Sequence, residues 1–227
     1  MINQIMKIEE LLRQYAIGEK NFSGLYLQEA HLLKANLEGA NFFEANLTGA
    51  NLSQANLSRV NLAKANLTGA NLIGTDLSEA NLSDTLLVGA KFNKADLTRA
   101  KLIRADLSCA DFSQVNMVDA DLSRAILYEI DLHGANLYGV NFRRAILNKA
   151  DLIGANLIRA NMTGVDLIEA NLTRANLTEA ILSGADLNGA SLLGANISDV
   201  NLVGAALQAV IMPDGTGYEE ISTSIQN

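Results

Sequence analysis

Few side chains in this sequence are of the types that perform catalysis or bind metal ions. The histidines are His31 and His133, and the single cysteine, Cys109, has no histidine in its own repeat unit to activate it as a nucleophile. Glu129, Asp131 and His133 are of metal-binding types, but the repeat pattern places them across a corner of the chain with no cavity implied. We therefore expect no catalytic residue, no metal, no cofactor, no small-molecule substrate and no enzymatic activity.

A second set of residues has the chemistry of binding. Arg104, Arg124 and Arg144 recur at intervals of twenty residues, and Lys101 and Arg143 accompany them. Like charges stacked at close spacing cost stability, which an anionic partner would relieve. Asp111, Asp131 and Asp151 recur at the same interval as an acidic column.

Apolar residues recur at this interval too, at positions that are polar in most of the sequence. The first column is Leu86, Ile126 and Ile146, with Val88, Tyr128 and Ile168 two residues further on, and the second is Val118, Tyr138 and Ile158. Arginine and tyrosine around exposed aliphatic residues are typical of an interaction hot spot. We predict a protein-binding patch composed of Arg104, Arg124, Ile126, Tyr128, Arg144 and Ile146. The alternative is that these residues form ordinary solvated columns.

Composition narrows the class of protein. The chain is 49% hydrophobic and 19% charged, with 17 glycines and one proline, which excludes collagen-like and disordered chains. A net charge of -8 disfavours direct binding to nucleic acid or to an anionic membrane. One cysteine cannot form an internal disulfide, Glu9 and Glu10 interrupt the start where a signal peptide is apolar, and no apolar run could span a membrane. We expect a cytoplasmic protein.

The dominant pattern is a strict period of five. An apolar residue occupies every fifth position from Phe22 through Leu207, most often preceded by Asn or Asp and, two positions before it, by Ala. On an α-helix these apolar residues would step by about 140° and spiral round every face. In a straight strand they would alternate between the two faces. The chain must therefore turn once per unit, with Leu filling an axis, Ala lining it, and the Asn or Asp pointing outward.

The phenylalanines at the Leu position indicate how many units make one coil. Phe22, Phe42 and Phe142 differ by multiples of twenty, as do Phe92 and Phe112. At twenty residues per coil they fall on two opposite sides of a square, whereas at fifteen they scatter over all three sides. The pattern favours four sides and a rod roughly 45 Å long at ~4.8 Å per coil.

These A-(N/D)-L-x-x units, as in Ala45-Asn46-Leu47-Thr48-Gly49, resemble the pentapeptide-repeat family over roughly residues 21–212. The resemblance implies an all-β fold, a right-handed quadrilateral parallel β-helix, with a short N-terminal capping α-helix. Members of the family often dimerise through the C-terminal end, so the resemblance also implies a possible homodimer.

The two ends of the chain depart from the repeat and define three segments. Residues 1–20 form the capping helix, expected from Asn3 to Tyr15 with Asn3 as N-cap and Gly18 as the stop. Residues 21–212 form the β-helix. Residues 213–227 are a C-terminal turn and polar tail, in which Met212-Pro213-Asp214-Gly215 has the composition of a type I turn. The tail either folds over the last coil or leaves it open for a dimer contact.

Three functions remain open. The leading hypothesis is a non-enzymatic protein-binding or scaffold protein with a regulatory role, since ELLRQYAIGEKNF and Ile211 to Gly215 resemble cyanobacterial family members, some of which regulate cell differentiation. The resemblance also implies an alternative, a DNA-mimic inhibitor or protector of DNA gyrase, because family members that protect gyrase look like duplex DNA. B-DNA carries about 26 negative charges over 45 Å, whereas this chain has a net charge of -8, which weighs against this alternative. The other alternative is a structural spacer without a specific partner.

Overall fold

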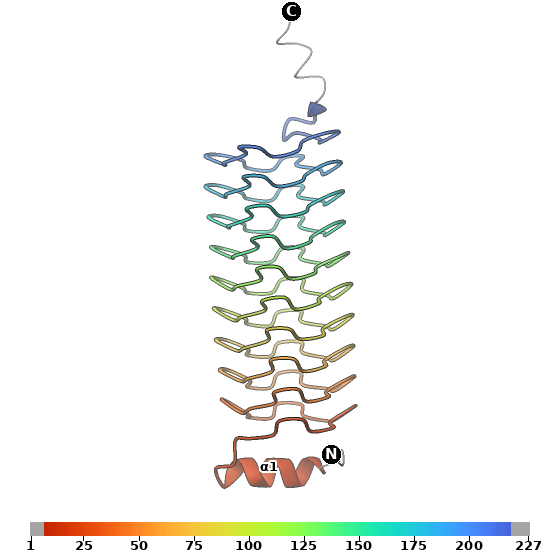
Figure 1. The fold of residues 1–227 in the computed structure, drawn as a ribbon, viewed down its shortest axis with the longest axis vertical. Coiled ribbons are helices and arrows are strands. Elements are labelled where there is room, and N and C mark those ends of the chain that lie inside the picture. The colour runs from red at the N-terminus through yellow and green to blue at the C-terminus, as the bar shows by residue number, and fades with distance from the viewer. Residues whose placement is uncertain (1–6, 219–227) are drawn as a thin grey trace, which may run out of the picture.

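The computed structural model describes residues 7–218, and they form one helix followed by a regular coil (Figure 1). The helix, α1, spans Ile8–Ala16, and Lys7 before it is extended. The expected start of the helix was therefore too early, and Asn3, the expected N-cap, lies outside the described residues. Gly18 ends the helix as expected, because it adopts a left-handed φ of 104° just after the C-cap. No helix within residues 7–218 is long and apolar enough to cross a bilayer.

Helix α1 lies across the N-terminal end of the coil (Figure 1). Its apolar stripe faces the core, where Leu11 is fully buried and Ile8 and Tyr15 pack against the buried cluster. The hydroxyl of Tyr15 donates a hydrogen bond to the carbonyl of Glu38 (2.9 Å), which joins the helix to the coil. The helix thus covers the first coil, whose end would otherwise expose unpaired backbone.

The coil repeats every twenty residues. Parallel bridges join each residue that precedes the axial Leu to its equivalent twenty residues later, from Asn21 with Asn41 to Ser191 with Ile211. Four such columns run along the rod: side 1 begins at Asn21, side 2 at Tyr26, side 3 at His31 and side 4 at Asn36. The bridges confirm a coil of four sides and twenty residues. Each bridge is isolated, so the β pairing along the described rod is a series of single rungs.

Each corner between two sides is a tight turn. At a representative corner the N–H of Ala45 donates to the carbonyl of Phe42 (2.9 Å), and the third turn residue, Glu44, has a φ of 56°. A positive φ at the third residue is the mark of a type II turn and favours glycine. Corners nevertheless hold charged residues at many of these positions, Arg104, Arg124 and Arg144 among them. The corner is the place where this fold presents a long side chain to solvent.

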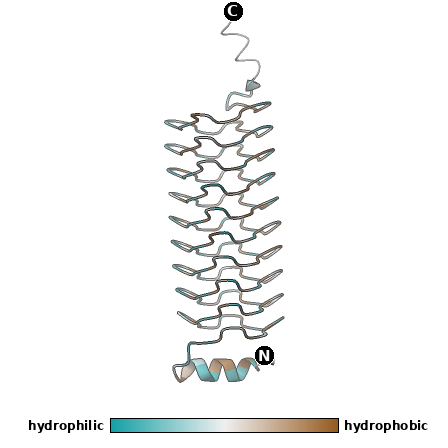
Figure 2. Cartoon of the chain, viewed as in Figure 1, coloured by the Kyte–Doolittle hydropathy of each residue, from teal (hydrophilic) through white to brown (hydrophobic). Residues whose placement is uncertain are grey.

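The core is a narrow column along the axis. Apart from the partly buried Ala35, the axial Leu residues and the Ala residues beside them are almost completely buried from Phe22 to Leu192. Phe22 stacks on Phe42 with ring centroids 5.5 Å apart, and Phe92 stacks on Phe112 at 4.2 Å. These pairs lie on sides 1 and 3, as the phenylalanine spacing predicts. Hydrophobic and hydrophilic residues occur together in every coil (Figure 2), because each unit contributes to both the axis and the surface.

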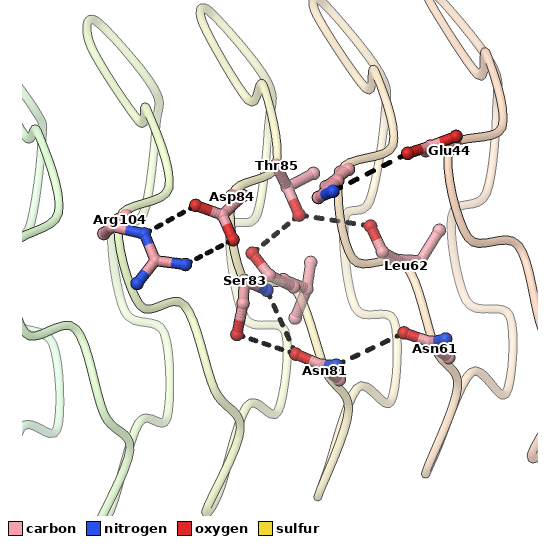
Figure 3. Close-up of polar contacts among 10 residues, drawn as sticks. Glu44, Asn61, Leu62, Asn81, Ser83, Asp84, Thr85 and Arg104 are labelled. Carbon is pink, nitrogen blue, oxygen red and sulfur yellow. Dashed lines mark hydrogen bonds and ion pairs between the residues drawn. The ribbon is translucent and has the colours of Figure 1, made fainter.

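Side-chain hydrogen bonds tie the coils together on the outside. Asn81 donates to Asn61 one coil earlier (3.3 Å) and accepts the N–H and hydroxyl of Ser83 in its own unit (Figure 3). Inside the rod, Thr85 replaces the usual Ala and donates its hydroxyl to the carbonyls of Leu82 (2.6 Å) and Leu62 (3.2 Å). Within the described residues no buried side-chain polar atom lacks a partner, so the repeat tolerates a buried threonine.

The C-terminal end is more open than the N-terminal end. The expected turn is present, since the N–H of Gly215 donates to the carbonyl of Met212 (2.9 Å), and the chain then reverses so that Gly217 pairs antiparallel with Ile211. The axial residues of the last coil, Leu202 and Leu207, remain half-buried. The rest of the expected polar tail, residues 219–227, lies outside the described residues.

Candidate protein-binding surface

The predicted arginines lie together on the corner between sides 1 and 2. Arg104, Arg124 and Arg144 occupy equivalent turn positions in successive coils, with φ values of 57°, 61° and 57°. Beyond them the same corner carries glycines, at Gly164, Gly184 and Gly204. We call the three arginines the arginine corner. Its positive charge therefore ends sharply toward the C-terminus.

The arginine corner is not uniform, because Arg104 has an intramolecular partner. Its Nε and Nη2 donate to the two carboxylate oxygens of Asp84, at 2.7 and 2.6 Å (Figure 3). The hydrogen bond from Arg104 lowers the pKa of Asp84, and the same bond raises the pKa of Arg104. Lys64 lies 3.7 Å from Glu44 earlier on this corner. Asp84 therefore already relieves the charge of Arg104 within the chain.

Arg124 and Arg144 form no ion pair within residues 7–218. Elsewhere on the corners, Arg99 pairs with Glu79 and Arg159 with Glu179, each at 2.7 Å and each one coil away. Among the described corners, only the arginine corner has arginines at equivalent positions of successive coils. Its two unpaired charges are therefore available to an external group.

A shallow groove of about 280 Å³ lies beside the arginine corner. Its lining includes Arg104, Ser123, Arg124, Asn141, Arg143 and Arg144. We call it the arginine groove. The sequence pattern drew attention to Arg143 but not to Ser123 or Asn141. The twenty-residue interval would have placed Asn141 next to Asp121, but it carries no information about the shape of the surface.

The apolar part of the predicted patch lies on side 2, next to the arginine corner. Ile126 and Ile146 pair directly in adjacent coils, and each keeps 39% of its surface exposed. Leu86 is also exposed, but Asp106 separates it from Ile126 in the column. The predicted three-residue strip is therefore a contiguous pair and an isolated leucine.

Tyr128 completes the patch at the next corner. Its side chain is 38% exposed, and the Nζ of Lys149 lies 5.6 Å from its ring centroid. The proximity of Tyr128 is the main cause that raises the pKa of Lys149. We call Arg104, Arg124, Arg144, Ile126, Tyr128 and Ile146 the side-2 patch. The structure brings these six residues onto one side of the rod and its two corners.

The second apolar column lies on the opposite side of the rod. Val118, Tyr138 and Ile158 are equivalent in successive coils at the end of side 4, and all are half-buried. Arg159 donates to the hydroxyl of Tyr138 (3.0 Å) and also to Glu179 (2.7 Å). The polar groups of this column are thus engaged within the chain, which favours side 2 as the free surface.

The acidic column lies on side 3, where Asp111 pairs with Asp131 and Asp131 with Asp151. Burial acts to raise the pKa of Asp111, but hydrogen bonds from Asn93 and Ser113 outweigh it and lower the pKa. The Nδ2 of Asn93 donates to Asp111 at 2.6 Å. Side 3 is opposite side 1, so the acidic column and the arginine groove face in different directions.

The residues with catalytic or metal-binding chemistry lie apart. Cys109 is an exposed corner residue, and His31 and His133 are both on side 3 but separated by several coils. The backbone N–H of His133 donates to the carboxylate of Asp131 (2.9 Å). Within the described part of the chain, no three His, Cys, Asp or Glu side chains are grouped so as to hold a metal ion.

Comparison with known proteins adds to this geometry. The sequence matches the family described as pentapeptide repeats in eight overlapping copies between residues 21 and 208. Among solved structures, HetL from the cyanobacterium Nostoc sp. strain PCC 7120, a pentapeptide repeat protein involved in heterocyst differentiation regulation, is 34% identical with a TM-score of 0.57. The match covers 94% of this chain and 100% of HetL.

Two other solved structures match with lower TM-scores. QnrB1, a plasmid-mediated fluoroquinolone resistance protein, is 17% identical with a TM-score of 0.40, over 91% of this chain and 94% of QnrB1. Rfr23 from the cyanobacterium Cyanothece 51142 is 35% identical with a TM-score of 0.23, over 49% of this chain and 58% of Rfr23. No curated protein matches this chain. The family match and the similarity to HetL indicate a repeat architecture.

Proposed function

Because the chain belongs to the pentapeptide-repeat family, we propose that it is a non-enzymatic regulatory protein that binds a protein partner through the side-2 patch. The family membership also supports right-handed winding of the four-sided coil. The axis of such a rod is filled, with Leu and Ala side chains buried from Phe22 to Leu192, so no substrate enters it. Function is then a property of the outer surface.

The proposal depends on the exposed apolar, arginine and tyrosine side chains that occur together on side 2. Exposed Ile126 and Ile146 stand in contact, two unpaired arginines border them on one corner, and Tyr128 borders them on the other. Aromatic and arginine residues around an apolar centre are the side chains that dominate binding energy in protein interfaces. Similarity to HetL supports a regulatory role of the cell-differentiation type.

A tagged pull-down from the native organism tests this proposal. We expect Arg124→Glu with Arg144→Glu to lose the co-purifying partner, because reversed charges repel an anionic partner surface. The matched control is Lys94→Glu with Arg174→Glu, two corner residues between sides 3 and 4 that also form no ion pair within residues 7–218. Retention of every partner by the side-2 variant would contradict the proposal, and so would equal losses in the two variants.

A DNA-mimic inhibitor or protector of gyrase is the second candidate. The acidic column on side 3 favours it, although the net charge of -8 is far below that of duplex DNA of the same length. The arginine corner opposes it, because duplex DNA presents negative charge all along its length. A supercoiling assay with purified gyrase separates the two candidates.

The C-terminal end of the coil offers a further surface, for a second copy of the chain. Leu202 and Leu207 are half-buried there, and within the described residues their N–H groups have no acceptor. Unpaired backbone at the end of a β structure pairs readily with another chain. A homodimer through this end leaves side 2 free for the partner.

A further inference from the structure

We infer that the arginine groove binds a phosphate monoester, which the partner of the side-2 patch carries on a phosphorylated side chain. This inference rests on the proposed function, because it names the chemistry of the partner. Arg104, Arg124, Arg143 and Arg144 all line this one groove of about 280 Å³. The groove is thus a concentration of positive charge on a chain whose net charge is -8.

In and beside the arginine groove, arginine side chains outnumber carboxylates. Arg124, Arg143 and Arg144 have no ion pair within residues 7–218, whereas Arg104 is held by Asp84. One further carboxylate, Asp121, adjoins the groove. Its Oδ1 already accepts the backbone N–H of Ser123 (2.9 Å) and the Nδ2 of Asn141 (3.0 Å). Three unpaired guanidinium groups therefore face a single carboxylate that is hydrogen-bonded to neutral donors.

Three guanidinium groups match a phosphate better than a carboxylate. Each guanidinium donates a fork of N–H groups, and a carboxylate offers these forks only two oxygens and a single negative charge. A phosphate monoester carries about -1.5 to -2 charges and three acceptor oxygens, so that it accepts several forks at once. Arg124 and Arg144 stand on successive coils, ~4.8 Å apart along the rod, which is close enough for one tetrahedral anion to bind both.

Ser123 supplies a neutral donor in the same groove. Ser78, Ser83 and Ser108 donate their hydroxyls to the Asn or Asp two residues before them, at 2.6 to 2.8 Å. The hydroxyl of Ser123 makes no such bond with any described residue, although its backbone N–H does bond to Asp121. A hydroxyl without a partner beside unpaired arginines is suited to a phosphate oxygen.

The position of the groove links it to the proposed interface. The arginine corner borders the groove on side 1 and the Ile126 and Ile146 pair on side 2. A partner that covers the exposed isoleucines therefore reaches the groove with a side chain at the margin of the contact. Phosphorylation of that side chain would add charge-assisted hydrogen bonds to the interface.

Fluorescence polarisation with short labelled peptides of glycine and serine tests the inference. The peptides carry one central phosphoserine, one serine or one glutamate. We expect the phosphopeptide to bind at least about tenfold more tightly than either of the others, because only phosphate engages several guanidinium forks. Arg124→Gln with Arg144→Gln should weaken phosphopeptide binding by about tenfold or more, whereas Lys94→Gln with Arg174→Gln should change it less than about twofold.

Three outcomes would overturn the inference. They are equal binding of the phosphoserine and glutamate peptides, equal losses in the two double variants, and no saturable binding at all. Free phosphoserine is included as a competitor. If it binds as tightly as the peptide, the assignment to a side chain of a partner is wrong, and the ligand is a free phosphate ester.

A phosphatase treatment of the native extract separates this inference from the proposed function. Under the inference, dephosphorylation weakens partner capture by the unaltered protein and by the Lys94→Gln with Arg174→Gln control. Capture that survives phosphatase but is lost in Arg124→Glu with Arg144→Glu would overturn the phosphate site and leave the proposed function standing. If the phosphopeptide binds but no partner is captured through side 2, the proposed function is overturned and the phosphate site stands.

Discussion

Deletion of residues 131–135 abolishes capture of the partner while the rod stays folded: this is the largest effect that we expect. The deletion removes one complete unit of five, so every later Leu still points into the axis. It also rotates the rest of the rod by a quarter turn relative to the preceding coils. Ile146 then stacks beyond Asp121 on side 1 instead of beyond Ile126 on side 2. The patch is split, and a hot-spot cluster of this kind contributes several kcal/mol, so binding falls by roughly a hundredfold or more.

Deletion of residues 51–55 is the matched control. It removes a unit of the same length but lies before Asp84, so the whole side-2 patch and the arginine groove rotate together and keep their internal geometry. Circular dichroism and thermal unfolding should give similar results for the two deletions, and only the 51–55 deletion should retain the partner in a pull-down. Equal retention by both would show that the alignment of Ile126 with Ile146 does not matter.

Phe112→Ala has the largest expected effect on stability, a loss of about 3–5 kcal/mol in the free energy of unfolding. Phe112 is fully buried in the middle of the rod and stacks on Phe92 with ring centroids 4.2 Å apart. A solenoid contacts only its neighbouring coils, so the cavity cannot be filled by rearrangement of distant segments. Urea unfolding followed by circular dichroism measures the loss.

Ile126→Ala provides the comparison for Phe112→Ala. Ile126 is exposed on side 2, so its truncation should change the free energy of unfolding by less than about 1 kcal/mol. Equal destabilisation of the two variants would contradict the expectation that the buried axis stabilises the rod and that the exposed side-2 residues do not. Together the two substitutions distinguish residues that stabilise the rod from residues that are exposed on it for binding.

The architecture of the rod was predictable because every unit repeats the same information. The period of five fixes which residues enter the axis, and Phe22 and Phe42 stack as their twenty-residue spacing predicts. In each unit the backbone preferences, the turn residues and the core packing all favour the same structure, so the fold can be predicted from the sequence. The start of α1 lacked such support, because Lys7 precedes it without a side-chain cap.

The candidate site was predictable only in part. The twenty-residue interval placed Arg124 above Arg104 and Ile146 above Ile126. It did not show that Arg104 is bound by Asp84, because ion pairs between corners depend on which way two long side chains extend. The Ser123 hydroxyl, which has no partner among residues 7–218, and the groove beside it likewise follow from side-chain positions that a repeat pattern does not specify.

Photo-crosslinking shows directly whether the rod binds its partner through side 2. A benzophenone amino acid is placed at Tyr128 on side 2 or at Tyr138 on the opposite side, each replacing a tyrosine of the native chain. We expect irradiation in the native extract to link the partner to position 128 and not to position 138. A crosslink of equal yield from position 138, or from that position alone, would contradict it.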